Sequence, residues 1–191
     1  YPISGGVKIH LEKHIPIAAG MAGGSTDAAA TLKGMNRLFD LGCTLKDLME
    51  LGVKIGADVP YCVMGGTALA EGIGEKLTPP APAPDCYVLV AKPDINVSTK
   101  YVYEHLDAQE IVKHPDIDGM VEAIAEESLQ GILDRMENVL ETVTVSAYPI
   151  IQTIKDRMKE LGAINSLMSG SGPTVFGIFV EKDMALSLIH I

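Results

Sequence analysis

The fold is decided by one stretch, Pro16-Ile17-Ala18-Ala19-Gly20-Met21-Ala22-Gly23-Gly24-Ser25-Thr26-Asp27-Ala28-Ala29-Ala30, in which small residues lead directly into a helical pattern. Its three glycines permit backbone angles and close approaches that a β-carbon forbids, so consecutive N–H groups can point at one oxygen-rich ligand. A serine and a threonine then add hydroxyl groups. The stretch has the composition of an anion-binding loop.

The residues after this loop predict a helix, because apolar side chains recur at Ala28, Leu32, Met35 and Phe39. At a helix N-terminus, unpaired N–H groups and the positive end of the helix dipole favour an anion, so we expect phosphate there. The simpler interpretation is a glycine-rich turn before a helix capped by Ser25. The density of glycines, hydroxyl groups and alanines favours the phosphate site. The pattern is neither a Walker A motif nor a dinucleotide fingerprint.

The composition is that of an ordinary globular protein, with 191 residues, 47% hydrophobic and 21% charged. A formal net charge of -10 argues against a nucleic-acid partner and against an anionic membrane surface. We expect the three cysteines, Cys43, Cys62 and Cys86, to be buried thiols in a reducing compartment, because their spacing fits no metal or redox motif. Without a signal segment or an apolar run of membrane length, the expected location is the cytoplasm.

The two ends of the chain carry their own expectations. Residues 7–12 alternate apolar and polar side chains, which predicts a strand, and Tyr1 is no initiator, so we expect the chain to begin within a domain that is truncated at its start. Residues 186–191 match one reading frame of a common transposase sequencing adapter, and we expect them to be a non-native tail.

A second motif, Gly56-Ala57-Asp58-Val59-Pro60-Tyr61, places one acid between a small-residue turn and a proline. Spacing alone favours Asp58 as the N-cap of a short helix that begins near Pro60. A catalytic carboxylate is the alternative interpretation. The two roles are compatible, since a capped turn fixes the direction of the carboxylate.

Local signals predict the elements of the first half of the chain. Thr44-Leu45-Lys46-Asp47 resembles a capping box for a helix that buries Leu48, Leu51 and Ile55. Residues 65–77 predict a hairpin with Gly72 and Gly74 in its turn. Four prolines within residues 78–84 predict a stiff connector, so we expect domains at residues 1–80 and 85–185.

The second half predicts a strand at residues 86–91 and a short helix capped by Ser98-Thr99 that carries Tyr101 and Tyr103, where an aromatic is normally core. Residues 117–133 have helical spacing, and Asn138-Val139-Leu140-Glu141 begins a further segment; we expect packing rather than chemistry from both. A helix opened by Tyr148-Pro149 is predicted to bury Ile150, Ile154, Met158 and Leu161. Residues 167–179 predict two strands joined by the turn Gly170-Ser171-Gly172.

Three motifs in one order, Pro-x-x-x-Gly-x-x-Gly-Gly-Ser-Thr, Gly-Ala-Asp-Val-Pro and the final Gly-Ser-Gly, resemble the GHMP kinases, the superfamily of galacto-, homoserine, mevalonate and phosphomevalonate kinases. The resemblance implies an α+β fold, with a partial N-terminal ATP-binding domain like domain 2 of ribosomal protein S5 and a ferredoxin-like C-terminal domain. It spans nearly the whole chain.

Within the superfamily the chain is most similar to the members that phosphorylate the 2-hydroxyl of a cytidine diphosphate-linked polyol in isoprenoid (terpenoid) precursor biosynthesis. The resemblance implies ATP and Mg²⁺, with Asp58 as the catalytic residue, Ser25 or Thr26 at Mg²⁺, and Tyr103 stacked on the cytosine ring. The implied substrate site adds Gly170, Ser171 and Gly172. The implied ATP site comprises Pro16, Ala18, Ala19, Gly20, Met21, Ala22, Gly23, Gly24, Ser25 and Thr26.

Several alternatives stay open at this point. Another GHMP kinase of mevalonate or homoserine type, or a non-catalytic ATP-binding homologue, would carry the same first loop. Asp27 is ambiguous, because an acid at a helix start suits the dipole but repels phosphate unless a cation intervenes. The family's N-terminal lysine and its cytidine-pocket residues do not appear in the sequence, so we expect this piece alone to be inactive. The expected state is a monomer or a homodimer.

Overall fold

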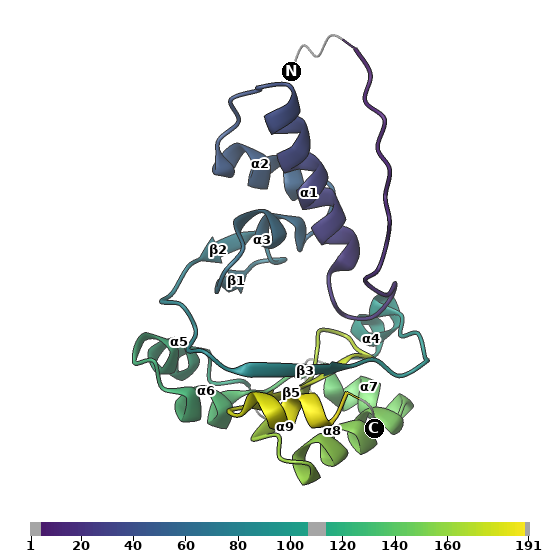
Figure 1. Ribbon diagram of the computed structural model, residues 1–191, viewed down its shortest axis with the longest axis vertical. Helices are drawn as coiled ribbons and strands as arrows, with labels where there is room; N and C mark the ends of the chain where they lie inside the picture. The colour runs from purple at the N-terminus through teal and green to yellow at the C-terminus, as the bar shows by residue number, and fades with distance from the viewer. Residues whose placement is uncertain (1–4, 107–113, 190–191) are drawn as a thin grey trace. The chain divides into compact units, whose positions relative to one another are not determined.

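A computed structural model describes residues 5–106 and 114–189. The chain divides into two compact units: unit 1 holds Tyr1–Ile17 and Ala22–Pro80, and unit 2 holds Ala18–Met21 and Ala81–Ile191 (Figure 1). No helix among the described residues is both long and apolar enough to cross a bilayer. The glycine-rich stretch therefore contributes to both units.

Unit 1 is built from helices and one hairpin. Its elements are α1 (Gly23–Leu38), α2 (Leu45–Gly52), α3 (Val59–Met64), β1 (Leu69–Glu71) and β2 (Lys76–Thr78). The three helices contact one another, and their buried apolar side chains are Ala29, Leu48, Val59 and Val63. The predicted hairpin is confirmed: β1 and β2 pair antiparallel, with Gly72 and Gly74 at positive φ in the turn.

The start of α2 confirms the predicted capping box. The Thr44 hydroxyl accepts from the Asp47 N–H at 3.2 Å, and the Asp47 carboxylate accepts from the Thr44 N–H at 2.8 Å. These bonds lower the pKa of Asp47, the Thr44 side chain having the largest effect. The predicted buried face is wrong at Ile55, which is 60% exposed because α2 ends at Gly52, before the next turn is reached.

The strand predicted at residues 7–12 is wrong. The segment is irregular, and no strand pairs with it among the described residues. Alternation of side chains supplies a face for a strand, but a strand also needs a neighbour for its N–H and C=O groups. The three cysteines are free thiols, as predicted, but all are partly exposed rather than buried.

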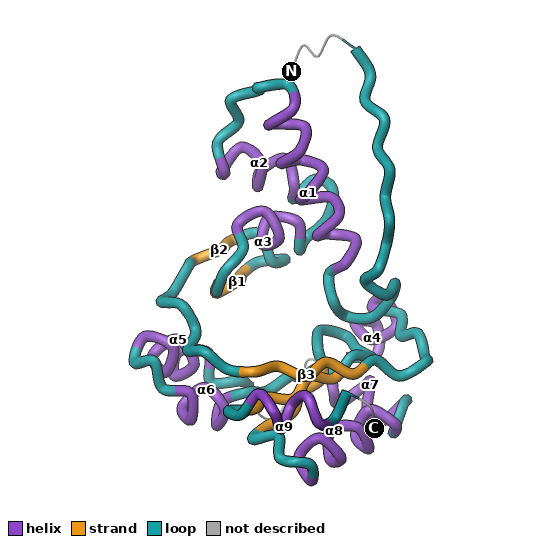
Figure 2. The backbone as a smooth tube through the Cα atoms, in the orientation of Figure 1, coloured by secondary structure: helices purple, strands orange, loops and turns teal. Residues whose placement is uncertain are grey.

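Unit 2 is centred on a three-stranded antiparallel sheet in the order β3-β5-β4. Figure 2 shows β3 and the other strands of unit 2 in orange, with helices beside them in purple. The predicted strands are confirmed as β3 (Tyr87–Ala91), β4 (Asn165–Met168) and β5 (Val175–Phe179). The helices are α4 (Thr99–His105), α5 (Ile117–Ala125), α6 (Leu129–Arg135), α7 (Glu141–Ala147), α8 (Ile150–Glu160) and α9 (Lys182–Ser187). Helix α8 packs on β4 and β5, and α9 packs on β3.

The core of unit 2 joins these two helices to one face of the sheet. Ile151 and Met158 of α8 pack with Met168, Val175 and Phe179 of the strands. The helix prediction for this segment is confirmed, and its predicted buried face is confirmed at Ile154 and Met158 but wrong at Ile150, which is exposed while Ile151 is fully buried. Pro149 occupies the N-cap position, and this sets where the helix begins.

Residues 117–133 form two helices rather than one continuous pattern. Helix α5 ends near Glu126, Glu127 adopts φ 53°, and the Ser128 hydroxyl caps α6 by accepting from the Gly131 N–H at 3.1 Å. At the other end, α9 includes residues 186 and 187 of the expected tail, while residues 190–191 lie outside the described part. The tail and the domain limits stay predictions.

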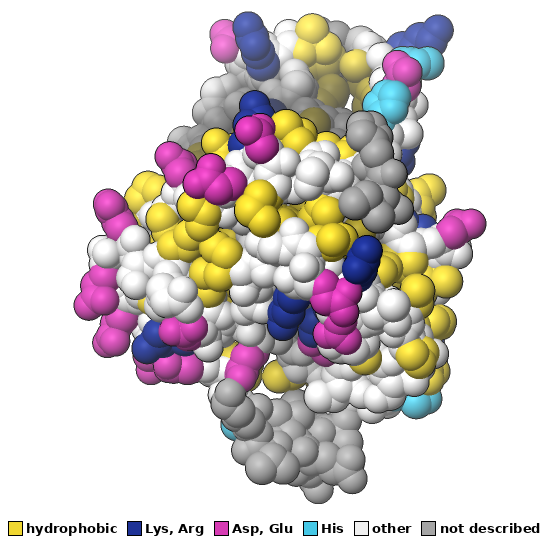
Figure 3. Space-filling model, turned by 60° about the horizontal axis from the view of Figure 1, so that its bottom comes forward, with side chains coloured by type: hydrophobic (Ala, Val, Ile, Leu, Met, Phe, Trp, Pro, Cys, Tyr) yellow, Lys and Arg dark blue, Asp and Glu magenta, His cyan; other side chains and the backbone are white. Residues whose placement is uncertain are grey.

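The chain carries more acidic than basic residues, and on the face drawn in Figure 3 the charged side chains are spread out. Acidic residues number 25 and basic residues 15. On the face drawn in Figure 3, acidic side chains are scattered among hydrophobic and uncharged ones, and Lys and Arg do not gather into one broad patch. A polyanionic ligand therefore needs local N–H groups and dipoles rather than a cationic surface.

Candidate functional site

The glycine-rich stretch becomes a helix start in unit 1. Helix α1 begins at Gly23, and its N-cap residue Ala22 has φ 47° and makes no side-chain cap bond, so the simpler interpretation with Ser25 as the cap is wrong. The first N–H with a helical acceptor is that of Thr26, which donates to the Ala22 carbonyl at 2.8 Å. By helix geometry the N–H groups of Gly23, Gly24 and Ser25 lack such acceptors and are open to a ligand.

The two glycines at the start of α1 have different surroundings. A β-carbon at Gly23 would lie 2.7 Å from Cγ2 of Ile15, so Gly23 is required by packing within unit 1. A β-carbon at Gly24 would meet no atom within 4 Å. Gly24 therefore borders open space at the helix start, where a ligand could approach the backbone.

The residues that lead into α1 are strained. Ala18 and Ala22 adopt φ 52° and 47°, in the left-handed region that alanine rarely occupies. Strain of this kind persists where surrounding structure over-determines it, and it clusters at functional sites. Of the other predicted loop residues, Ala19 is buried, Met21 is half-buried and Pro16 is exposed.

Lys13 supplies the cation that the ambiguous Asp27 needs. The Lys13 ammonium donates to Oδ2 of Asp27, and the two side chains are 25% and 28% exposed. Lys13 Nζ also lies 3.4 Å from the position of a β-carbon on Gly23, beside the helix start. The pair neutralises the acid next to the open N–H groups. The sequence alone gave no sign of this contact, because the two residues are 14 positions apart.

The two candidate hydroxyl groups differ in what they contact. Thr26 Oγ1 donates to the Ala22 carbonyl at 3.1 Å and lies 3.6 Å from Sγ of Cys62. The Ser25 hydroxyl has no hydrogen-bond partner among the described residues. No cluster of three or more His, Cys, Asp or Glu able to hold a metal ion occurs in the described part of the chain. A hydroxyl oxygen fits Mg²⁺, which binds few protein ligands and keeps phosphate and water oxygens.

Asp58 occupies the N-cap position of α3 but does not cap it. Its side chain makes no cap hydrogen bond, so the interpretation favoured by spacing is wrong. Within the described residues its exposed carboxylate has no hydrogen bond or ion pair. Gly74, at φ 112°, lies alongside, and a β-carbon there would be 4.0 Å from Oδ1 of Asp58. The carboxylate is therefore available to a ligand.

In unit 2, two motifs that are far apart in sequence meet. We call residues 169–172 the C-terminal glycine loop. The Ser169 hydroxyl donates to the Gly20 carbonyl at 2.7 Å, across 149 positions. Gly20 has φ 69°, and a β-carbon on it would lie 2.2 Å from the Ser169 carbonyl oxygen. No other residue type fits at Gly20, because both the backbone angle and the space exclude a side chain.

The C-terminal glycine loop also contacts the start of α4. Gly170 and Gly172 have φ 56° and 86°. The Ser171 hydroxyl lies 2.8 Å from the hydroxyl of Thr99, and the Ser171 carbonyl accepts from the buried Thr144 hydroxyl at 3.2 Å. The predicted helix capped at Ser98 is confirmed, since Ser98 Oγ accepts from the Tyr101 N–H at 3.3 Å.

The two tyrosines of α4 are not core residues. Tyr103 is 61% exposed and Tyr101 is 40% exposed, contrary to what is normal for an aromatic at such a position. The Tyr101 ring lies 4.0 Å from the His105 ring, between centroids, at 32°. Tyr103 has no aromatic partner among the described residues, so a planar ligand could stack on its face.

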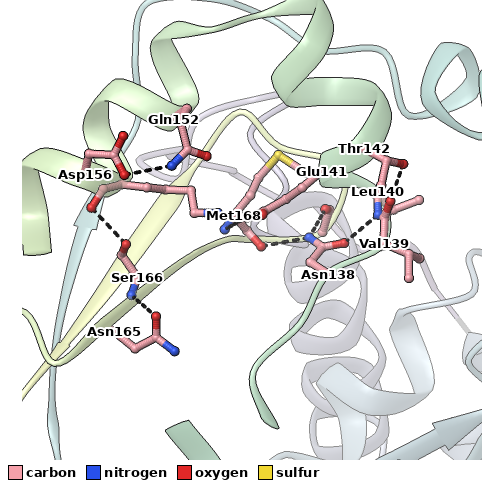
Figure 4. Close-up of polar contacts among 12 residues, drawn as sticks. Asn138, Val139, Leu140, Glu141, Thr142, Gln152, Asp156, Asn165, Ser166 and Met168 are labelled. Atoms are coloured by element: carbon pink, nitrogen blue, oxygen red, sulfur yellow. Dashed lines mark hydrogen bonds and ion pairs between the residues drawn. The ribbon is translucent and has the colours of Figure 1, made fainter. Parts of the chain in front are cut away.

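Sequence reasoning missed Asn138 and Glu141, from which packing alone was expected. Asn138 Nδ2 donates to the carbonyls of Met168 and Gly170, both at 2.8 Å, and Glu141 Oε1 accepts from the Met168 N–H at 2.8 Å (Figure 4). The sequence feature that could have pointed to these two residues is the spacing of an Asn three residues before a Glu at a helix start, which is a capping pattern. The contacts themselves span about 30 positions, which a local pattern does not reveal.

Comparison with known proteins places this geometry in a family. The family model described as GHMP kinases N terminal domain matches residues 1–66, and the one described as GHMP kinases C terminal matches residues 120–189. A protein of Lachnospira eligens named 4-diphosphocytidyl-2-C-methyl-D-erythritol kinase is 58% identical over 98% of this chain and 65% of its own length. One of the same name from Lachnoclostridium phytofermentans is 60% identical over 97% of this chain and 64% of its own.

Two solved structures of kinases are similar in fold to this chain. A crystal structure of 4-(cytidine 5'-diphospho)-2C-methyl-D-erythritol kinase has a TM-score of 0.78 and 34% identity, covering 92% of this chain and 63% of that one. A homoserine kinase from Cytophaga hutchinsonii has a TM-score of 0.79 at 22% identity, with 92% and 61% covered, which shows a shared fold. The chain spans about 65% of the length of the curated relatives it matches. Matching both terminal domain models in order, with an α+β fold, the chain belongs to the GHMP kinases.

Proposed function

We propose that the protein containing this chain transfers the γ-phosphoryl group of ATP to the 2-hydroxyl of 4-diphosphocytidyl-2-C-methyl-D-erythritol, in isoprenoid precursor biosynthesis. The observation that carries the proposal is 58% and 60% identity, over nearly the whole chain, to two proteins of that name. A reaction of this class needs mainly positioning and stabilisation of charge rather than covalent catalysis. The chain offers the groups for both.

The phosphates of ATP are proposed to bind at the start of α1. N–H groups without a helical acceptor meet the positive end of a 16-residue helix, and Gly24 leaves room for the ligand. When bound, Mg²⁺ would neutralise phosphate charge, and the Ser25 hydroxyl is the side chain that would hold it. The Lys13 ammonium keeps the Asp27 carboxylate from repelling the phosphates.

Asp58 is proposed to accept the proton of the substrate hydroxyl, or to orient that hydroxyl, as its oxygen attacks the γ-phosphorus. A carboxylate with no internal partner is free to accept a hydrogen bond from an alcohol. Gly74, which lies alongside, leaves space next to this carboxylate for the hydroxyl. The substrate's cytosine is proposed to stack on Tyr103, and Gly170, Ser171 and Gly172 are proposed to contact the substrate.

The test uses the product of the complete open reading frame, because the chain spans only part of its relatives' length. Transfer of labelled γ-phosphate from ATP is measured with 4-diphosphocytidyl-2-C-methyl-D-erythritol, mevalonate and homoserine as acceptors. Transfer to the cytidine-linked polyol alone supports the proposal. Preference for mevalonate or homoserine would instead identify another GHMP kinase, and ATP binding without transfer to any acceptor would identify a non-catalytic homologue.

A further inference from the structure

The C-terminal glycine loop has two backbone N–H groups without a partner. The N–H of Ser169 donates to the Thr174 carbonyl at 2.8 Å, and that of Gly172 donates to the Ser169 carbonyl at 2.9 Å. Between them, the N–H groups of Gly170 and Ser171 have no acceptor among the described residues. Adjacent N–H groups of this kind form a concavity suited to an anionic oxygen. Ser171 is a buried residue, and a backbone N–H in such a place usually has an acceptor, which a ligand oxygen could supply.

The direction of the Ser171 N–H is set by the carbonyl of Gly170. In a trans peptide the C=O of one residue and the N–H of the next point in opposite directions. The Gly170 carbonyl is fixed by Asn138 Nδ2, which donates to it at 2.8 Å. The Ser171 N–H therefore points away from Asn138. If this peptide plane turned, the N–H would leave the ligand side of the loop and a carbonyl oxygen would replace it.

Glycine makes such a turn easy, so the loop needs an external restraint. Gly170, at φ 56°, has no β-carbon and tolerates the change in its ψ angle that turning the Gly170–Ser171 peptide requires. The amide of Asn138 is fully engaged: both N–H bonds of Nδ2 reach carbonyls, of Met168 and Gly170, and Oδ1 accepts from the Leu140 N–H at 3.0 Å. A side chain with two donors on one atom is needed for this arrangement.

Glu141 restrains the same strand end from one turn further along. Its Oε1 accepts from the Met168 N–H at 2.8 Å, and its Oε2 accepts from the Lys155 ammonium at 2.5 Å. The Lys155 side chain is 9% exposed, so the pair is largely shielded from water. Asn138 and Glu141 thus hold the carbonyl and the N–H of Met168, the residue from which the loop departs (Figure 4).

We propose that Asn138, supported by Glu141, is a positioning residue that fixes the Gly170–Ser171 peptide so that the Ser171 N–H is aimed at a phosphoryl oxygen of the bound ligand. The proposal rests on the proposed function for the identity of that ligand. We call the hydrogen bonds that join Asn138 and Glu141 to Met168 and Gly170 the clamp. The clamp lies within unit 2 and can be measured without any ligand.

The test compares Asn138→Ala and Asn138→Asp with Asn165→Ala and Asn165→Asp. Asn165 is the matched control, since its Nδ2 donates to the Leu133 carbonyl at 2.8 Å and its Oδ1 accepts from the Ser166 N–H at 2.8 Å, at the opposite end of β4. The first measurement is the ¹H–¹⁵N spectrum of the 191-residue chain labelled at serine and glycine. The Ser171 amide signal is expected to shift or broaden in the Asn138 variants and to stay unchanged in the Asn165 variants.

The second measurement is the KM and kcat of the complete protein for ATP and for the cytidine-linked polyol. One lost hydrogen bond to a charged group is expected to raise the KM for one of the two about 10- to 100-fold in the Asn138 variants alone. A folded Asn138 variant with an unchanged Ser171 amide signal would contradict the positioning role of Asn138. The role would also be contradicted if both Asn138 variants unfolded while both Asn165 variants stayed folded, because Asn138 would then serve the fold as a whole. Inactive wild-type protein with the expected spectral change would contradict the proposed function and leave the clamp supported.

Discussion

At the scale of single residues, the structure separates glycines that serve packing from those that border open space. Ile15 leaves no space for a β-carbon on Gly23, whereas a β-carbon on Gly24, one position later, would contact no other atom within 4 Å. A larger residue at Gly23 would therefore disturb unit 1 whether or not a phosphate binds there. Gly24 is the better probe of the proposed phosphate site.

Gly24→Ala is expected to weaken ATP binding without weakening the fold. The added methyl group occupies the space proposed for phosphate, while alanine in a helix is more favourable than glycine by roughly 0.5–1 kcal/mol. Gly34→Ala, in the middle of the same helix and equally unobstructed, is the control. Calorimetric titration with ATP and thermal melts should show both variants at least as stable as wild type and a loss of affinity in Gly24→Ala only. Equal ATP affinity in all three proteins would refute the phosphate site.

Asp58→Asn is expected to lower turnover by about 10²–10⁴-fold, the usual scale for loss of a general base. Since Asp58 makes no cap hydrogen bond, the substitution should leave the melting temperature and the ATP affinity unchanged. Single-turnover kinetics on the complete protein measure the chemical step directly. A variant that transfers phosphate at the wild-type rate would remove Asp58 from the mechanism.

Tyr103→Ala is expected to cost roughly 1–3 kcal/mol of affinity for the cytidine-linked polyol, the range for stacking of a base on an aromatic ring. ATP affinity and stability should barely change, because the ring is exposed. Tyr101→Ala is the control: it removes a ring from the same helix that already contacts His105. Matching losses in both variants would argue for a general effect on α4 rather than stacking.

At the scale of elements, those defined by neighbours in sequence could be predicted, and those defined by distant partners could not. The capping box of α2, the glycine turn of the hairpin and the strand that became β3 all follow from local chemistry. The irregular segment at residues 7–12 shows the limit, since its pattern is that of a strand and no partner strand is present among the described residues.

Some residues of the candidate site could likewise be predicted from local sequence, and others could not. The glycine stretch and Asp58 were identifiable as unusual local compositions, and the structure adds that Asp58 does not cap its helix. Lys13 beside Asp27, and Asn138 beside Gly170, depend on contacts 14 and 32 positions apart. At the start of α8, the burial of Ile151 in place of Ile150 depends on packing against the strands of unit 2, which lie far away in the sequence.

The capping box of α2 predicts a pH dependence of stability. Hydrogen bonds from Thr44 lower the pKa of Asp47 in the folded protein, so the unfolded chain binds the proton more readily. This stabilisation is present above the unfolded pKa of about 3.9 and is lost as the pH falls through the folded value. A double-mutant cycle of Thr44→Ala and Asp47→Asn, followed by thermal melts from pH 7 to pH 2, should show coupling that disappears at the acidic end. Coupling independent of pH would contradict a role for the ionised carboxylate.

At the scale of the whole molecule, the two units differ in how much apolar surface supports them. Among residues 5–106 and 114–189, the core of unit 1 has four buried apolar residues and that of unit 2 has ten. In unit 1, Val7, Ile9 and Leu11 are all exposed on an irregular segment. Since burial of apolar surface is the main favourable term in folding, the units should open with different free energies.

Amide hydrogen exchange of the 191-residue chain is therefore expected to be faster in α1, α2 and α3 than in β3, β4, β5 and α8. Leu48→Ala, which removes a core side chain of unit 1 at a cost of about 2–5 kcal/mol, should accelerate exchange further in the three helices of unit 1 and leave the strands of unit 2 protected. Ile151→Ala should do the reverse within unit 2. Mass spectrometry of peptides from each unit measures both effects. If either substitution accelerated exchange equally in both units, the chain would unfold as one cooperative body, and its local stability would not follow the size of each core.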